Sequence, residues 1–199
     1  ATLATSGWVA GELERMGLAP HTVGLATDLD VFGPLAGVER RDDLVLSLGR
    51  TNPLKRFELT LAALGQVDGA DVTLFGSEPR LGDEHGLRYV ASPSDAEVNR
   101  LYNEATVLVL TSSHEGFSLP PLEAMAAGLP VVCTDADGNR DFCRDGENCL
   151  MPEPTPEAVA AAIRRLLDEP DLRARLSAAG LKTAAQYGWE PRIDALERV

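Results

Sequence analysis

One stretch of the sequence decides the fold: His114-Glu115-Gly116-Phe117-Ser118-Leu119-Pro120-Pro121-Leu122-Glu123-Ala124-Met125-Ala126-Ala127-Gly128. The apolar run 107–110 precedes it and is typical of a buried strand. After the strand, Ser118 is suited to a helix N-cap, and Pro120 and Pro121 to the first turn, where a missing N–H is tolerated. Gly128 is suited to end this helix. The stretch therefore predicts a helix whose N-terminus lies at the end of a buried strand.

The N-terminus of that helix is a predicted anion site, because unpaired amides and the positive end of the helix dipole coincide there. The predicted donors are the backbone amides of Gly116, Phe117, Ser118 and Leu119. Glu115 and Glu123 flank these amides, and carboxylates accept strong charge-assisted hydrogen bonds from hydroxyl groups. A phosphate site between two acceptors of this kind suits a sugar nucleotide, with the ribose on one side and the sugar on the other.

Residues 115–132 resemble the E-x7-E signature of retaining glycosyltransferases of family four, which have the GT-B fold. The matching residues read Glu-Gly-Phe-Ser-Leu-Pro-Pro-Leu-Glu-Ala-Met-Ala-Ala-Gly-Leu-Pro-Val-Val. The resemblance implies that Glu115 contacts the donor sugar, that Glu123 contacts the ribose, and that the amides after Glu115 hold the diphosphate. It extends over about residues 28–195 and covers only the C-terminal, donor-binding half of a two-domain enzyme.

From residue 44 onward, strand and helix patterns alternate, which predicts a doubly wound parallel sheet. The predicted strands are 44–48, 71–75, 87–90, 107–110 and 130–133, with 148–151 as a candidate sixth. The predicted helices are 57–64, 95–105, 155–167 and 171–187, besides the one after Ser118. We therefore expect an α/β, Rossmann-like sheet of about six strands with helices on both faces, one half of a GT-B fold. Residues 44–199 form this domain, and residues 1–43, with a short helix at 6–16, are expected to be a linker and the remnant of a missing N-terminal domain.

Ligands of such sheets bind beyond the carboxyl ends of the strands. Gly49, Arg50 and Lys55 follow the first strand and Gly76 ends the second, so they are expected to meet the Glu115 loop at that edge. In the family that this sequence resembles, an arginine and a lysine at the corresponding positions bind the donor phosphates. Two cations and a helix N-terminus can stabilise a departing nucleoside diphosphate without a metal ion. Without the resemblance, Arg50 and Lys55 could equally be solvated surface residues.

Glu115 has two candidate roles, catalytic nucleophile or hydrogen-bond acceptor for sugar hydroxyls. The second role fits better, since family members are thought to react by front-face displacement, in which the leaving phosphate helps to deprotonate the acceptor. Glu123 is predicted off the core face of its helix, where it would otherwise be a solvated residue. Base recognition is expected from backbone atoms near residues 91–93.

Composition limits the other partners. The formal net charge of −13 argues against nucleic acid or an anionic membrane as a partner of the domain. Any peripheral membrane contact is expected only through the missing half, and a cytoplasmic location is expected because no leader or stretch of about 18 apolar residues is evident.

No metal or cofactor is expected. Asp135-Ala136-Asp137 has the form of a metal-binding DxD, but it follows the fifth predicted strand, where the resembling family has an acceptor-side loop rich in glycine. It is therefore interpreted as a turn. The three cysteines lack CxxC spacing; Cys133 is interpreted as a buried small side chain, and a disulfide between Cys143 and Cys149 stays open. Gly138 is the one glycine left of that loop's usual pair, and Cys149 stands where the family usually has glycine.

The sequence thus predicts a retaining, metal-independent glycosyltransferase of the hexosyltransferase class, with a nucleotide-diphosphate sugar as substrate. The chain would be its donor-binding half, inactive alone, and its partners the donor and the missing acceptor-binding domain. The alternatives are a stand-alone nucleotide-sugar binding module without catalysis and a GT-B sugar-nucleotide epimerase. The sequence lacks G-x-G-x-x-G after the first predicted strand and also lacks a P-loop motif, which argues against a nicotinamide dehydrogenase and a P-loop nucleotidase.

Overall fold

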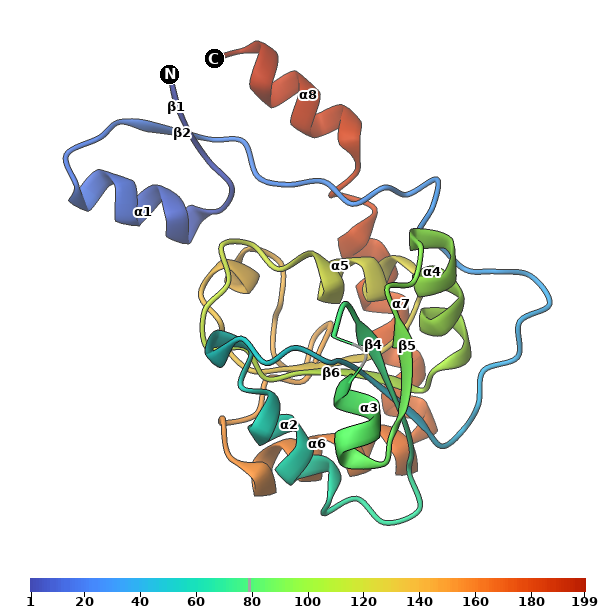
Figure 1. Ribbon diagram of the computed structural model, residues 1–199. Coiled ribbons are helices and arrows are strands. Elements are labelled where there is room, and N and C mark those ends of the chain that lie inside the picture. Colours follow the sequence, from blue (N-terminus) through green and yellow to red (C-terminus); the bar gives the residue numbers. More distant parts are fainter. Residues whose placement is uncertain (79) are drawn as a thin grey trace.

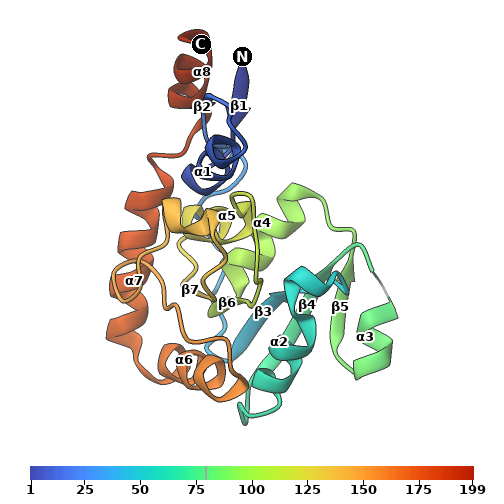
Figure 2. The ribbon, with the colours of Figure 1, turned by 90° about the vertical axis from the view of Figure 1, so that its left-hand side faces the viewer.

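A computed structural model of the chain describes residues 1–78 and 80–199. The body of the molecule (Figure 1) contains a five-stranded parallel sheet, and its strand order is β5-β4-β3-β6-β7 (Figure 2). In chain order the strands are β3 (Leu44–Leu48), β4 (Asp71–Gly76), β5 (Arg88–Ala91), β6 (Val107–Leu110) and β7 (Val131–Cys133). The predicted doubly wound α/β fold is confirmed.

Successive residues of the central strands face opposite sides of the sheet, as a period of two requires. Leu44 and Leu46 belong to the core on one side, whereas Val45 belongs to the core on the other. Both faces are thus buried, which explains why β6 is a continuous apolar run. The one polar residue of β3, Ser47, is buried with its hydroxyl donating to the carbonyl oxygen of Val109 over 2.8 Å.

Helices cover both faces of the sheet (Figure 2). Helices α4 (Asp95–Glu104) and α5 (Leu119–Ala126) contribute to one core, and α2 (Phe57–Leu64) and α6 (Pro156–Asp168) to the other. Helix α7 (Pro170–Ala184) packs against both α5 and α6, and α3 (Arg80–His85) lies beside β5. A capping box formed by Ser94 and Glu97 begins α4, which the sequence analysis predicts as a helix at 95–105.

The direction of strand addition reverses at β3. The chain adds β4 and β5 on one side of β3, then returns to add β6 and β7 on the other. The carboxyl ends of β3 and β6 therefore flank the switch point, where open α/β sheets bind ligands.

A small unit precedes the sheet. Strands β1 (Thr2–Ala4) and β2 (Pro20–Thr22) pair in parallel around helix α1 (Gly7–Arg15). This unit and the terminal helix α8 (Trp189–Glu197) stand at the same end of the molecule in both views (Figures 1 and 2). Residues 23–43 then cross to β3 along α4, where Asn99 and Asn103 accept bonds from the amides of Gly33 and Leu35.

Two predictions of local structure are wrong. Residues 148–151 form no sixth strand, only isolated bridges of Leu150 with Val132 and of Cys149 with Asp145, because the backbone groups on either side of Leu150 bond to the turn at 144–146. Ser118 does not cap α5 with its side chain; it has φ 80° and makes no cap hydrogen bond. The physical reason is that the two following positions where a cap would find donors are Pro120 and Pro121, which have no N–H. The sequence interpretation also omitted helices α3 and α8.

Candidate functional site

Three loops meet at the carboxyl edge of the sheet, and hydrogen bonds between them fix their positions. The amide of Ser113, after β6, donates to the carbonyl oxygen of Leu54 in the short helix η1 (Pro53–Lys55) over 2.7 Å. The hydroxyl of Thr51, after β3, donates to Glu78, after β4, over 2.6 Å. The loops after β4, β3 and β6 are therefore linked in the order of their strands.

Gly49 follows β3 and Gly76 ends β4, and the backbones of these two residues lie close together. A Cβ atom on Gly76 would lie 2.8 Å from the carbonyl oxygen of Gly49, and one on Gly49 would lie 2.7 Å from the Tyr89 ring. Gly76 also has φ 152°, a value that L side chains rarely adopt. Glycine is thus needed at both positions by packing.

The structure brings Lys55 and Glu115 together, although 60 residues separate them in the chain. The Lys55 Nζ atom lies 2.6 Å from Glu115 Oε1, and the two side chains are 25% and 16% exposed. Partial burial makes this pair stronger than a surface salt bridge. Since an ammonium group has three donors, Lys55 keeps two for another acceptor.

The loop 116–119 presents unbonded amides at the N-terminus of α5. Within the described residues, no protein acceptor is recorded for the amides of Gly116, Phe117, Ser118 and Leu119. The Phe117 side chain is 3% exposed and packs against Phe142 and Tyr187, with ring centroids 5.3 and 5.9 Å away. The buried ring anchors the loop while its amides stay available.

A second loop supports the Glu115 backbone. The Glu115 amide donates to the carbonyl oxygen of Ala136, and the Gly138 amide donates to that of Glu115, both over 3.0 Å. A Cβ atom on Gly138 would lie 2.4 Å from the oxygen of Gly116, so only glycine fits there. The sequence marked this glycine only as a remnant of the acceptor-side loop.

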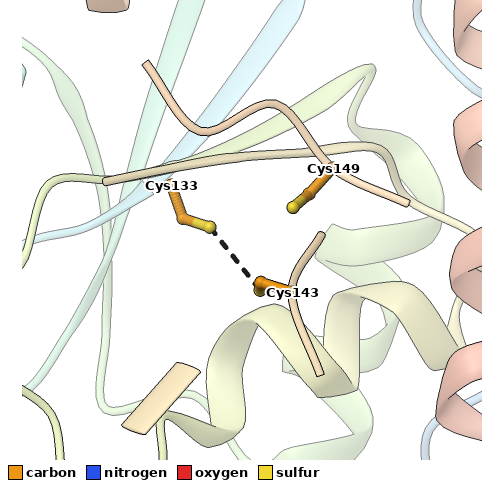
Figure 3. A group of neighbouring side chains, drawn as sticks. All are labelled: Cys133, Cys143 and Cys149. Atoms are coloured by element: carbon orange, nitrogen blue, oxygen red, sulfur yellow. Dashed lines mark hydrogen bonds between the residues drawn. The ribbon is translucent and has the colours of Figure 1, made fainter. Parts of the chain in front are cut away.

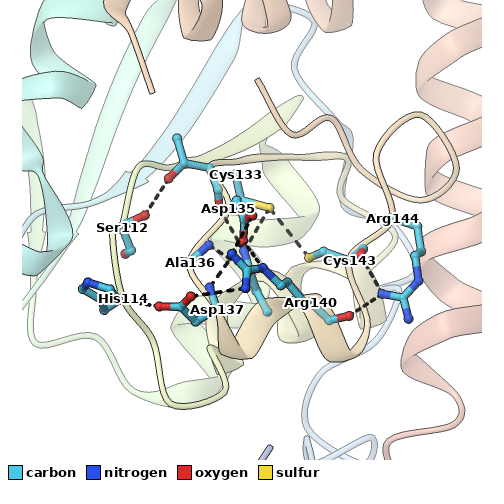
Figure 4. A network of polar contacts seen from close by, with 11 residues as sticks. Ser112, His114, Cys133, Asp135, Ala136, Asp137, Arg140, Cys143 and Arg144 are labelled. Atoms are coloured by element: carbon cyan, nitrogen blue, oxygen red, sulfur yellow. Dashed lines mark hydrogen bonds and ion pairs between the residues drawn. The ribbon is translucent and has the colours of Figure 1, made fainter. Parts of the chain in front are cut away.

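Asp135 and Asp137 lie in that second loop, in the turn before the short helix η2 (Gly138–Asp141), and both already have cationic partners (Figure 4). Asp135 accepts two bonds from Arg140, over 2.7 and 2.9 Å, and Asp137 bonds His114 and also lies near Arg140. The Arg140 guanidinium lowers the pKa of Asp135 below its usual value. The interpretation of the DxD as a turn agrees with this geometry.

Glu123 lies one turn into α5. Its predicted place off the core face allowed a fully solvated side chain, but the structure does not leave it exposed. It is half-buried, and the hydroxyl of the fully buried Tyr102 donates to its Oε2 atom over 3.2 Å. Burial raises the pKa of Glu123 to about 7; Asp95 adds to the rise, and the Tyr102 bond opposes it. No sequence pattern had indicated Tyr102.

Arg50 differs from the other predicted residues. Its side chain is exposed, and among the described residues no hydrogen bond or ion pair is recorded for it. Its backbone nevertheless follows Gly49 at the same edge. The structure therefore gathers Gly49, Gly76, Lys55, Glu115 and the 116–119 amides, and leaves the Arg50 guanidinium outside the bonded network.

A hollow of about 390 Å³ lies beside the 116–119 loop, which contributes Phe117 to its lining. The rest of the lining comes from β2 and the segment after it, from residues 140–144, from Tyr187 and from α8. The lining residues are Thr22, Val23, Gly24, Phe117, Arg140, Asp141, Arg144, Tyr187 and Arg192.

None of the described helices is long and apolar enough to cross a membrane.

Comparison with known proteins adds a family to this geometry. The family model described as "Glycosyl transferases group 1" matches residues 36–183. The chain is 34% identical to the O-antigen biosynthesis protein RfbC of Myxococcus xanthus, over 92% of the chain and 16% of that protein. It is 30% identical to a D-inositol 3-phosphate glycosyltransferase of Frankia alni, over 84% of the chain and 49% of that protein.

Solved structures show the same fold. A sucrose-phosphate synthase from Thermosynechococcus elongatus superposes with a TM-score of 0.86 at 26% identity, covering 98% of this chain and 56% of that one. Anabaena HepE in complex with UDP-glucose superposes with a TM-score of 0.84 at 17% identity, covering 98% and 62%. The chain thus spans half or less of the two curated relatives named above.

Proposed function

Because the chain belongs to the family of glycosyl transferases group 1, we propose that it is the donor-binding half of a retaining glycosyltransferase of family four. The donor is a nucleoside diphosphate sugar, the reaction needs no metal ion, and the chain alone transfers little or no sugar. The one observation that carries the proposal is the set of unbonded amides at 116–119, flanked by the Lys55–Glu115 pair and by Glu123.

The diphosphate would lie against these amides. The four N–H groups without a recorded protein acceptor and the positive end of the α5 dipole favour an anion there. Lys55 would add charge-assisted bonds through the two N–H groups that Glu115 does not use. Donors held in place by the fold would stabilise the charge that develops on the leaving diphosphate as the sugar departs.

The two glutamates would recognise hydroxyl groups on either side. Glu115 stands on the loop before the amides, and its contact with Lys55 orients it to accept bonds from the sugar. Glu123 stands one turn into α5, oriented by Tyr102, and would accept bonds from the ribose diol. Glu115 serves here as an acceptor rather than as a nucleophile, and the leaving phosphate takes part in deprotonating the acceptor substrate.

We further propose that an acceptor-binding domain packs against the β1–α1–β2 unit and α8. Large apolar side chains are exposed there: Leu3, Met16, Leu18, Trp189, Ile193 and Leu196. A large group of exposed apolar side chains often marks a surface that another protein or domain covers. The curated relatives named above are at least twice as long as the matched region, which supports a second domain in the enzyme.

Two other functions remain as alternatives. A stand-alone binding module would use the same donor site and would never transfer sugar, even when joined to an acceptor domain. A GT-B sugar-nucleotide epimerase would convert the donor without any acceptor. Product analysis with the chain joined to its proposed upstream domain separates all three, since only the transferase forms a glycoside that depends on an acceptor.

Calorimetric titration tests the donor site directly. We expect at least one of UDP, GDP and ADP to bind the chain, and the preferred nucleotide identifies the base. Glu115→Ala should chiefly reduce discrimination among the sugar conjugates of that nucleotide, and should lower the affinity for the nucleotide itself less than Lys55→Ala does. Heat changes indistinguishable from dilution for all three nucleotides would contradict the donor site.

A further inference from the structure

The three cysteines of the chain converge on one point, although they come from three separate segments (Figure 3). Cys133 ends β7, Cys143 follows η2, and Cys149 lies in the turn that leads to Leu150. All three are buried. Their sulfur atoms all lie within 4.8 Å of one another, and those of Cys133 and Cys143 are 3.7 Å apart.

This spacing fits coordination of one ion by three sulfur atoms. With metal–sulfur bonds of about 2.3 Å, sulfur atoms around a tetrahedral or trigonal ion are roughly 3.8–4.0 Å apart. The observed separations reach that range with small side-chain rotations. A disulfide needs about 2.05 Å between two sulfur atoms and would leave the third thiol of the cluster unused.

The cluster also has the ligand chemistry of a site for a soft cation. Sulfur ligands select soft cations over hard ones. The side-chain amide of Asn139 donates to the Cys133 sulfur over 3.7 Å and so helps to hold this side chain in place.

We propose that Cys133, Cys143 and Cys149 form a binding site for a soft d10 cation of the class of Cu(I), Zn(II) and Cd(II). On binding, three sulfur–metal bonds replace the S–H bonds, and the protons pass to solvent. The ion would join β7, the end of η2 and the 149 turn. This inference is independent of the donor site and assigns the ion no part in sugar transfer.

The site has a structural consequence for the donor loop. Gly138, in the segment between Cys133 and Cys143, packs on the Glu115–Gly116 peptide and donates to the Glu115 carbonyl. An ion that fixes both ends of this segment would therefore restrain the loop that supports Glu115.

Titration of the reduced, metal-free chain with Cd(II) under anaerobic conditions tests the proposal. We expect a sulfur-to-cadmium charge-transfer absorption that saturates at one ion per chain, with the release of two to three protons in an unbuffered indicator assay. All three thiols should resist alkylation when the ion is bound. A hundredfold excess of free ion over Kd should raise Tm by roughly 5–10 °C. Mg(II), a hard cation, should produce none of these changes.

Variants distinguish the site from general effects of stability. Cys143→Ser and Cys149→Ser should each weaken Cd(II) binding by at least about 100-fold. Loss of a metal ligand reduces affinity more than loss of a residue that only orients a ligand, which typically reduces it about 10- to 100-fold. Leu150→Ala removes a buried neighbour but no sulfur atom and should still bind one ion. Circular dichroism checks that each variant is folded, and thiol protection in the unmodified chain provides the test should a serine variant not fold.

Three outcomes would overturn the proposal. The first is the absence of a 1:1 charge-transfer signal, and the second is protection of only two thiols by the ion. The third is unchanged affinity in the folded serine variants. Rapid formation of a Cys133–Cys143 disulfide in air, without ion uptake under reducing conditions, would identify the cluster as a redox pair instead.

Discussion

At the scale of single residues, the Lys55–Glu115 pair joins a proposed phosphate ligand to a proposed sugar ligand. The contact of 2.6 Å with Glu115 holds Lys55 near the loop that presents the 116–119 amides. A preorganised cation loses less side-chain entropy on binding than a free one. The pair is therefore expected to contribute to affinity through position as well as charge.

Lys55→Ala should weaken binding of the preferred nucleoside diphosphate about 10- to 100-fold, the loss of one or two charge-assisted hydrogen bonds. Binding of the corresponding nucleoside monophosphate should fall less, because it lacks part of the diphosphate. Calorimetry measures both. Lys182→Ala removes an equal charge from an exposed position on α7 and should leave both affinities unchanged; equal losses in the two variants would show a nonspecific charge effect.

Glu123 is expected to make donor binding depend on pH. Its pKa is raised to about 7 by burial, so the carboxylate that would accept the ribose hydroxyls is about 10% formed at pH 6 and about 90% formed at pH 8. Affinity should rise up to about tenfold over this interval. Glu123→Gln separates this effect from titration of the phosphate groups, because the variant keeps only the phosphate contribution. Parallel pH profiles for the two proteins would contradict the role of Glu123.

The same shift has a consequence for stability. Glu123 has a higher pKa in the folded chain than in the unfolded chain, so its protonated form is favoured by folding. Its contribution to stability is fully present at pH values below the unfolded-state pKa and is lost as pH rises through about 7. Relative to Glu123→Gln, the unmodified chain should lose stability between pH 5 and pH 8, by an amount on the order of 1–3 kcal/mol. Denaturant unfolding at both pH values measures the difference.

At the scale of elements, the packing of η2 on the donor loop decides where Glu115 lies. Bonds from Glu115 to Ala136 and from Gly138 to Glu115 join two loops that follow neighbouring strands, β6 and β7. The loop before α5 also has Ser118 at φ 80°, a strained conformation for a non-glycine residue. The donor loop therefore depends on its neighbour for its conformation.

Gly138→Ala should displace that loop. The added Cβ would meet backbone oxygens of Gly116 and Glu115 at 2.4 and 2.6 Å, so the backbone must move. We expect a stability loss of about 1–3 kcal/mol and a clear decrease in donor affinity. Gly33→Ala is the matched control, since a Cβ there meets no atom within 4 Å. Unchanged nucleotide binding in folded Gly138→Ala would mean that the loop contact does not support the site.

At the scale of the whole molecule, strand order decides which loops can cooperate. β3 lies between β4 and β6, so the loops after these three strands share one edge although they are far apart in the chain. The cations and donors at this edge come from the protein itself, with Lys55 and the 116–119 amides near the switch point.

Nucleotide affinity should therefore be the same with Mg(II) present as with EDTA, because protein groups supply the positive charge that a metal would provide. Calorimetry in the two buffers measures this. An increase of more than about tenfold with Mg(II), preserved after correction for metal–nucleotide association, would contradict a metal-independent donor site.

The sequence by itself determined much of the fold. The alternating apolar strands, the Ser94 capping box and the helix after the Glu115 loop were predictable because their signals are local, in periodicity or in residues a few positions apart. A local pattern can also give a wrong prediction. Ser118 was predicted to cap the helix, but a side-chain cap needs backbone N–H groups at the second and third helical positions, and both are prolines. The prediction of a sixth strand was wrong because backbone groups of residues 148–151 form hydrogen bonds with the turn at 144–146 instead of with a neighbouring strand.

Only the tertiary structure decided which residues meet. Lys55 finds Glu115 across 60 positions, Tyr102 finds Glu123 across 21, and three cysteines without a recognisable spacing gather at one point. These contacts depend on strand order and on how the loops pack at the sheet edge, which are set by the free energy of the whole core rather than by any short segment. Sequence thus specified the elements and the candidate donor loop, whereas the burial and partners that set the charge of each side chain arose only when the elements packed together.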